Sequence, residues 1–121
     1  MTEPLPPGLY IVATPIGNLG DLSPRAADVL ARADLVLAED KRVTARLLAG
    51  AATRPAMRTY NDHSDEEDRA SIVARLGREA VALVSDAGTP LISDPGYKLV
   101  RDARAAGHEI VSVPGPCAAI A

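Results

Sequence analysis

An α/β fold, with an open and mostly parallel sheet carrying helices on both faces, is predicted by two features of this sequence. Short apolar runs rich in β-branched residues, typical of buried strands, recur along the chain. Between them lie segments with helix start signals, helical spacing of apolar residues and glycine stop signals. Strands that alternate with helices in this way, without a sequence repeat, indicate a parallel sheet covered by helices.

Length and composition limit the chain to one core. A chain of 121 residues can bury one sheet between helix layers. Because only 2% of the residues are aromatic, that core must be built from Ala, Val, Leu and Ile. The single Cys117 excludes an internal disulfide. No stretch has the apolar length of a membrane span, and the N-terminus lacks a signal pattern. We therefore expect a cytoplasmic protein with no membrane partner.

The first half of the chain contains three predicted strands and two predicted helices. Residues 1–8 are a proline-rich leader, expected to be loose, and the apolar, β-branched run at 9–14 predicts the first strand. Ser23 followed by Pro24 is a helix start signal, and Gly50 ends the second helix. The expected elements are strands at 9–14, 35–38 and 57–60 and helices at 24–33 and 41–49.

The second half continues the alternation. Ser64 with Glu67 three residues later predicts a capping box at the start of the third helix. Asp94 followed by Pro95 opens the fourth helix, and Gly107 closes it. The expected elements are a helix from 64 to about 77, a strand at 81–84, a helix at 95–106, a strand at 109–113 and a helix that starts at 117.

The segment 81–97 is the stretch that most strongly predicts a site. It joins a buried strand to the helix start at Asp94 through the loop 85–90, where Gly88 permits unusual dihedral angles and Pro90 prevents a further strand. A buried strand, a loop of small polar residues and a new helix N-terminus form a ligand crevice in parallel α/β sheets. The loop lacks a lysine that could cradle phosphates. We interpret it as the floor of a small-ligand site.

Five short loops rich in Gly, Pro, Asn and acidic residues each follow a predicted strand directly. In a parallel sheet such loops gather at the carboxyl edge, where these folds bind ligands. Any one of them is better explained as an ordinary turn, since turns favour the same residues. Five at one edge favour a site. The loops contain residues 15–21, 39–40, 61–63, 86–90 and 114–116.

Several familiar chemistries lack their residues. Only Gly17 and Gly20 follow the first strand, which is not a G-x-G-x-x-G dinucleotide motif, and the chain has no P-loop Gly-Lys-Ser/Thr. The lone cysteine and the two histidines are scattered and predict no metal site. A non-enzymatic phospho-receiver domain needs a lysine after the last strand, where this chain has Pro114.

Four motifs together identify a family. They read ATPIGNLGD at 13–21, AEDKRVT at 38–44, VALVSDAGTPLISDPGY at 81–97 and VPGP at 113–116. With these motifs the chain, from residue 9 onward, resembles the tetrapyrrole-methylase superfamily. It most closely resembles the members that methylate a cytidine ribose 2′-hydroxyl of small-subunit ribosomal RNA with S-adenosyl-L-methionine. The family pattern Glu-Asp-Thr-Arg is replaced here by EDKR at 39–42.

The resemblance implies that residues 9–121 are an N-terminal α/β domain whose C-terminal partner domain is absent from this chain. Family members bind S-adenosylmethionine in the cleft between the two domains and usually form homodimers. A fragment with half of that cleft is expected to be inactive alone. By resemblance, the cofactor contacts are expected at Ile16, Gly17, Ala87, Gly88, Thr89, Ile92, Cys117 and Ala118.

The implied reaction transfers a sulfonium methyl group to a ribose oxygen. The enzyme then mainly positions its substrates and removes the hydroxyl proton. Asp94 is also explained as a helix N-cap, and Asp86 as a hydrogen-bond partner of its own loop. A base from the absent domain is a further alternative, so the choice stays open. The candidate bases are the carboxylates at the carboxyl edge: Asp40, Asp86 and Asp94, with Glu39 ranked below them.

Charge is segregated along the middle of the chain, although the net charge of −3 gives no overall reason to expect a nucleic-acid partner. Residues 41–61 include five basic and no acidic residues, whereas 62–68 include five acidic and no basic ones. We expect the basic stretch to contact phosphates of the RNA substrate. The alternative is a solvated helix face in which Arg46 or Arg58 pairs with nearby acids. The basic residues are Lys41, Arg42, Arg46, Arg54 and Arg58.

Two other functions stay open beside an RNA methyltransferase that acts on the small ribosomal subunit. One is methylation of a corrin or porphyrin precursor by another branch of the superfamily. It is disfavoured because the motifs at 39–40 and 89–95 match the RNA-modifying branch closely. The other is a non-catalytic α/β binding module.

Overall fold

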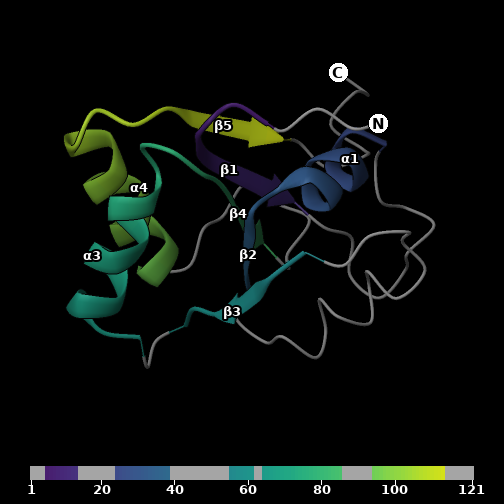
Figure 1. Ribbon diagram of the computed structural model, residues 1–121. Helices are drawn as coiled ribbons and strands as arrows, with labels where there is room; N and C mark the ends of the chain where they lie inside the picture. The colour runs from purple at the N-terminus through teal and green to yellow at the C-terminus, as the bar shows by residue number, and fades with distance from the viewer. Residues whose placement is uncertain (1–4, 14–23, 39–54, 62–63, 86–93, 114–121) are drawn as a thin grey trace, which may run out of the picture.

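The computed structural model describes residues 5–13, 24–38, 55–61, 64–85 and 94–113 (Figure 1). They form a five-stranded sheet of order β3-β2-β4-β1-β5, in which every paired strand runs parallel to its neighbour. Helices pack on both faces, so the predicted fold class is confirmed. The strands are β1 (Gly8–Ala13), β2 (Leu35–Ala38), β3 (Met57–Thr59), β4 (Ala80–Ser85) and β5 (Ile110–Val113).

The central strands are covered on both sides. All of β2 and residues 81–84 of β4 are buried. Their continuous apolar sequences follow from this, because a strand with a helix layer on each face has no polar side. The edge strand β3 is partly buried at best, and only Val113 of the edge strand β5 is fully buried.

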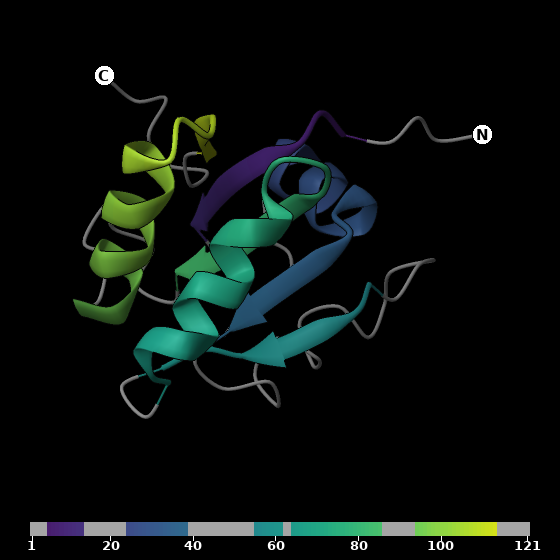
Figure 2. The ribbon, with the colours of Figure 1, turned by 60° about the vertical axis from the view of Figure 1, so that its left-hand side comes forward.

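Three helices are described. α1 (Pro24–Arg32) covers one face of the sheet, and α3 (Glu66–Arg75) and α4 (Asp94–Ala105) lie side by side on the other (Figure 2). None of the described helices has the length and apolar character needed to cross a membrane. The predicted helices at 41–49 and from 117 lie outside the described residues.

Two apolar clusters hold the layers together, one on each face of the sheet. On the first face, Val29 and Leu30 of α1 pack against Val12 and Val36 of the sheet. On the second face, the side chains of Ile72, Leu76, Leu99 and Ala103 pack against Leu9, Leu35, Leu37, Val81 and Leu83.

The start of α3 lies one residue from the predicted capping box. Asp65 is the N-cap: its carboxylate accepts from the Asp68 N–H at 2.8 Å, and the Asp68 carboxylate accepts from the Asp65 N–H at 3.2 Å. Ser64 closes the preceding turn, because its hydroxyl accepts from the Asn61 N–H at 3.1 Å and its own N–H donates to the Asn61 carbonyl at 2.9 Å. The prediction of a Ser64–Glu67 box is therefore wrong.

The end of α4 follows the glycine signal. Gly107 has a φ of 84°, and its N–H donates to the Arg104 carbonyl at 3.0 Å. The next N–H, of His108, donates to the Ala103 carbonyl at 3.0 Å. These two bonds form a Schellman motif, which satisfies carbonyls that the helix leaves unpaired.

The domain includes residues that the sequence places in the leader. β1 starts at Gly8, one residue before the predicted strand. Leu5 packs against the cluster under α1, and the Tyr10 hydroxyl donates to the Pro6 carbonyl at 2.7 Å. Leu5 and Pro6 therefore contact the core and the first strand, and Gly8 belongs to that strand.

Replacing Gly8 by alanine is expected to destabilise the domain by roughly 1–3 kcal/mol. Gly8 has a φ of 148°, which side-chain-bearing residues rarely adopt, and a Cβ there would lie 2.9 Å from the Glu109 carbonyl oxygen. Urea unfolding measures the change. Gly77→Ala is the matched control, because the nearest atom to a Cβ at Gly77 is 3.6 Å away, on the ring of His108. Equal losses in both variants would contradict the argument.

Candidate functional site

The register of the sheet brings the carboxyl ends of the strands to one edge. Ala13, at the end of β1, pairs with Ser85, at the end of β4, and the last residue of β5 pairs with Val12. Ala38 and Thr59, at the ends of β2 and β3, pair with each other. In Figure 2 the arrowheads of β1, β2 and β3 point the same way. The five strand ends that precede the predicted loops therefore share this carboxyl edge.

Within that edge, the boundary between β1 and β4 has a special topology. The connection after β1 carries α1 and leads to β2, whereas the connection after β4 carries α4 and leads to β5 on the far side of β1. α1 and α4 lie on opposite faces of the sheet. Adjacent strands whose following helices cover opposite faces define a topological switch point, where open α/β sheets bind ligands.

The predicted cofactor residues belong to segments that begin at or beside this switch point. Segments 14–23 and 86–93 follow β1 and β4, and 114–121 follows β5, which pairs with β1. The eight residues themselves lie outside the described part of the chain, so their contacts stay predictions. They are Ile16, Gly17, Ala87, Gly88, Thr89, Ile92, Cys117 and Ala118.

The candidate bases are placed only in part. Asp40 and Asp86 lie outside the described residues, and each follows a strand closely, β2 and β4 respectively. Asp94 is the first residue of α4, so it begins the helix that follows segment 86–93. The structure therefore places the Asp94 backbone next to the segment predicted to bind the cofactor.

Of the five basic residues predicted to contact RNA, Arg58 is described. Its guanidinium pairs with the Asp68 carboxylate at 3.0 Å, and its side chain is about one third exposed. This ion pair is the contact that the alternative interpretation expects, and RNA binding by Arg58 stays a prediction. The others lie outside the described residues: Lys41, Arg42, Arg46 and Arg54.

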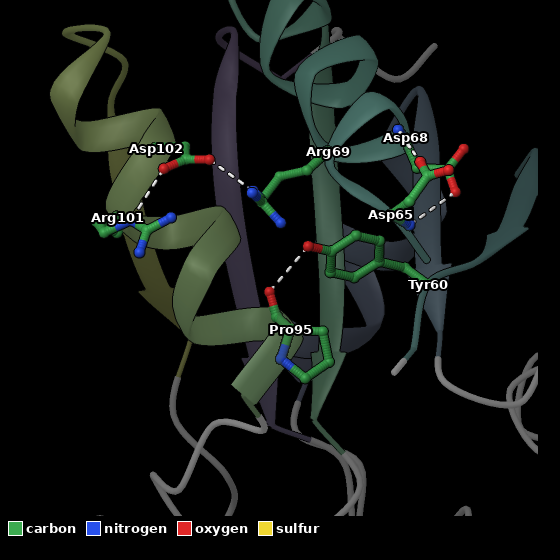
Figure 3. A network of polar contacts seen from close by, with 7 residues as sticks. All are labelled: Tyr60, Asp65, Asp68, Arg69, Pro95, Arg101 and Asp102. Carbon is green, nitrogen blue, oxygen red and sulfur yellow. Dashed lines mark hydrogen bonds and ion pairs between the residues drawn. The ribbon is translucent and has the colours of Figure 1, made fainter. Parts of the chain in front are cut away.

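Tyr60 connects the carboxyl edge to the start of α4 (Figure 3). Its backbone N–H donates to the Ala38 carbonyl at 2.8 Å, and its buried hydroxyl donates to the Pro95 carbonyl at 2.9 Å. Tyr60 thus joins the ends of β2 and β3 to the first turn of α4. No sequence motif singles out Tyr60, although it is one of three tyrosines in a chain without Phe or Trp and follows a strand directly.

A second contact joins α3 to α4. The Arg69 guanidinium donates to the Asp102 carboxylate at 2.6 Å, and Arg101 donates to the other oxygen of that carboxylate at 3.0 Å (Figure 3). These hydrogen bonds hold the pKa of Asp102 below its usual value, and the bond from Arg69 has a larger effect than the bond from Arg101. Burial raises the pKa of the Tyr60 phenol, and the nearby Arg69 opposes that shift. Tyr60 is therefore neutral and a donor at pH 7.

Replacing Asp102 by asparagine is expected to lower stability at pH 7 by about 1 kcal/mol, since the ion pair is partly exposed. Because the pKa of Asp102 is lower in the folded state than in the unfolded chain, this carboxylate stabilises the domain at any pH above its unfolded-state pKa of about 4. The contribution is lost as the pH falls through the folded-state pKa. The variant should therefore lose less stability than the native chain on acidification. Urea unfolding at pH 7 and at about pH 3 measures the stability loss caused by the substitution and the acid sensitivity of each protein.

Asp28→Asn is the matched control for that experiment. Asp28 pairs with Arg32 at 2.9 Å one turn away in the same helix, and the side chain of Asp28 is 53% exposed. We expect a change of no more than about 0.5 kcal/mol at either pH. An Asp102 variant that keeps the full acid sensitivity of the native chain would contradict the role given to this carboxylate.

Other surface features of the described residues do not coincide with the switch point. Residues of the acidic start of α3 line a shallow hollow: Asp65, Glu66, Glu67 and Ala70. Within the described ranges, no three His, Cys, Asp or Glu side chains are grouped as a metal site would require.

Comparisons with known proteins give a consistent result. A sequence model of the family described as Tetrapyrrole (Corrin/Porphyrin) Methylases matches residues 8–121. Relatives named ribosomal RNA small subunit methyltransferase I are 51% identical over 115 residues in Vibrio cholerae, 50% over 120 in Mesorhizobium japonicum and 53% over 117 in Xylella fastidiosa. These matches cover 94%, 98% and 96% of this chain, but only 40%, 41% and 43% of the relatives.

Among solved structures, a conserved hypothetical protein from Aeropyrum pernix K1 is similar, with a TM-score of 0.69 at 24% identity. The match covers 92% of this chain and 39% of that one. At this identity the likeness concerns the fold alone. In both kinds of comparison the chain spans about two fifths of the protein that it matches.

Proposed function

The chain belongs to the tetrapyrrole (corrin/porphyrin) methylase family, and from this membership we propose that it is the N-terminal domain of an S-adenosyl-L-methionine-dependent methyltransferase. The proposed substrate is a cytidine ribose 2′-hydroxyl of small-subunit ribosomal RNA. The small ribosomal subunit is then the partner, the location is cytoplasmic, and the full-length protein is a homodimer. Relatives at about 50% identity that are named for small-subunit ribosomal RNA support the choice of substrate.

The observation that carries the proposal is the switch point between β1 and β4. The two segments that begin there, 14–23 and 86–93, contain glycine, alanine, threonine and asparagine but no lysine or arginine. They offer backbone amides and small side chains, which suit the amino-acid carboxylate and the adenosine of S-adenosylmethionine better than a phosphate chain. Residues such as Ile16, Gly17 and Gly88 would hold the cofactor. When bound, it would supply an activated methyl group.

The chain's own residues would position the ribose and accept its proton. A general base must reach the hydroxyl within hydrogen-bond distance, and Asp40, Asp86 and Asp94 are the candidates at the carboxyl edge. Tyr60 supports this arrangement, because its bond to the Pro95 carbonyl holds the first turn of α4, where Asp94 lies.

A corrin or porphyrin precursor is the second candidate substrate, because the matching family description names these compounds. In that case the same cofactor site would serve a small molecule. The two substrates differ in size and charge, so one assay separates them.

The test is a methyl-transfer assay with the full-length protein and labelled S-adenosylmethionine. Small ribosomal subunits, naked small-subunit RNA and a tetrapyrrole precursor are offered in parallel, and the modified nucleoside is identified by mass spectrometry. We expect a 2′-O-methylcytidine and no label on the tetrapyrrole. Residues 1–121 alone are expected to transfer no methyl group, because much of the ligand would stay solvated in half of a cleft. Label on the tetrapyrrole only would overturn the proposal.

A further inference from the structure

The outer side of α4 carries one exposed tyrosine and three exposed basic residues. Tyr97, Arg101 and Arg104 are spaced i, i+4 and i+7, which places them on one side of the helix, and Lys98 lies beside this row. All four are exposed, and Tyr97 is 63% exposed. Leu99 and Ala103, on the opposite side, are buried against the sheet. We call the four exposed residues the α4 face.

The α4 face is positively charged. Arg101 shares the Asp102 carboxylate with Arg69, so these three groups together keep one positive charge. Neither Lys98 nor Arg104 is paired with another residue of the described ranges. Two further cations thus point to solvent beside the exposed tyrosine.

The neighbouring helix has the opposite charge where it meets the carboxyl edge. The first turn of α3 contains the exposed acids Glu66 and Glu67. Arg58, the cation close to that turn, is already paired with Asp68. α3 and α4 lie side by side with both N-termini toward the carboxyl edge (Figure 2). A polyanion that runs along α4 from this edge is therefore repelled by the first turn of α3 and attracted by Lys98, by Arg101 and, in the last turn of α4, by Arg104.

An aromatic side chain among cations is the combination that binds single-stranded nucleic acid. A base stacks on the ring, and the cations neutralise phosphates. One exposed tyrosine would not by itself indicate a partner, but Tyr97 is aligned with two arginines. Its helix turn is also held in place, because Tyr60 bonds to the carbonyl of Pro95, two residues before Tyr97. From Tyr97 to Arg104 the row is about 10 Å long at 1.5 Å per residue, enough for a base and the phosphates next to it.

We propose that the α4 face contacts the RNA substrate, with Tyr97 stacking on an unpaired base and Lys98, Arg101 and Arg104 contacting phosphates. This rests on the proposed function and adds to it a surface that the basic stretch at 41–58 does not include. α4 starts directly after segment 86–93, so RNA held on this face passes beside the predicted cofactor segment.

The test measures binding of a small-subunit RNA fragment by the full-length protein over a range of salt concentrations. Lys98→Ala and Arg104→Ala should each weaken binding and reduce the slope of log K against log[salt] by about one unit. Tyr97→Ala should weaken binding by about 5- to 100-fold, the effect expected for the loss of one stack, with the salt slope unchanged. Tyr97→Phe keeps the stacking ring and should bind like the native protein.

Arg25→Ala is the matched control. Arg25 is an exposed cation of α1, which covers the other face of the sheet, and its removal should change neither affinity nor slope. In steady-state assays the variants of the α4 face should raise the KM for RNA and leave the KM for S-adenosylmethionine unchanged. A merely structural defect would raise both and would lower the unfolding midpoint.

The outcomes separate this inference from the proposed function. One outcome would overturn only the proposed role of the α4 face. It is native-like RNA affinity and a native-like KM for RNA, with methyl transfer intact, both in Tyr97→Ala and in a Lys98→Ala/Arg104→Ala double variant. Weakened binding to whole subunits but unchanged binding to naked RNA would show that the face meets a ribosomal protein, which also overturns it. Failure of the native protein to bind or methylate small-subunit RNA would overturn both proposals.

Discussion

Replacing Gly88 by valine is expected to abolish binding of S-adenosylmethionine to the full-length protein while the fold persists. Gly88 belongs to segment 86–93, which begins at the end of β4 beside β1, and ligands of open α/β sheets bind at such a point. If segment 86–93 holds the cofactor as proposed, a branched side chain at this position would enter the space of the ligand. We expect affinity to fall by about 100-fold or more, which is about 3 kcal/mol at 1.4 kcal/mol per tenfold. Calorimetric titration measures the affinity.

A graded series distinguishes ligand space from backbone strain at Gly88. If the residue only serves the turn, Gly88→Ala and Gly88→Val should both lower the unfolding midpoint, because both forbid a glycine-only conformation. If it borders the ligand, affinity should fall with side-chain size while the midpoint stays constant. Native affinity in a folded valine variant would reject the proposed cofactor segment.

Replacing Leu99 by alanine is expected to destabilise the domain by about 2–5 kcal/mol, because it removes a buried side chain and leaves a cavity. Leu99 is fully buried where α4 packs on the sheet, in a cluster with Ile72 and Leu83. A loss of this size is a large share of the stability of a small domain. Equilibrium urea unfolding measures it.

Leu99→Met is the matched variant for this position. Methionine has nearly the same volume and adapts its shape, so the loss should stay below about 1.5 kcal/mol. If alanine and methionine destabilise equally, or if neither does, α4 does not pack on the sheet through this side chain.

Most of the architecture could be predicted from local sequence signals. The continuous apolar runs of β2 and β4 indicate strands buried on both faces, and Gly107 marks the end of α4. Such signals are short-range, because each depends on residues that lie within one turn or one strand. For the same reason the motifs that identify the family could be found without the structure.

The capping box shows where a local signal is ambiguous. Both Ser64 with Glu67 and Asp65 with Asp68 have the required spacing and chemistry. The choice falls on Asp65 because Ser64 already bonds to Asn61 in the preceding turn. A pattern of spacing does not record which of two competing hydrogen bonds a side chain makes.

The sequence by itself determined the fold class and the approximate bounds of the described strands and helices, and it predicted a ligand site at the carboxyl edge. Only the tertiary structure decided the strand order, and with it the switch point between β1 and β4. It also decided that Tyr60 reaches Pro95 across 35 residues of chain and that the exposed side of α4 is aromatic and cationic. Each of these features depends on contacts between residues that are distant in the sequence. The buried parallel strands have similar apolar side chains, so no local signal in the sequence indicates which strand lies beside which.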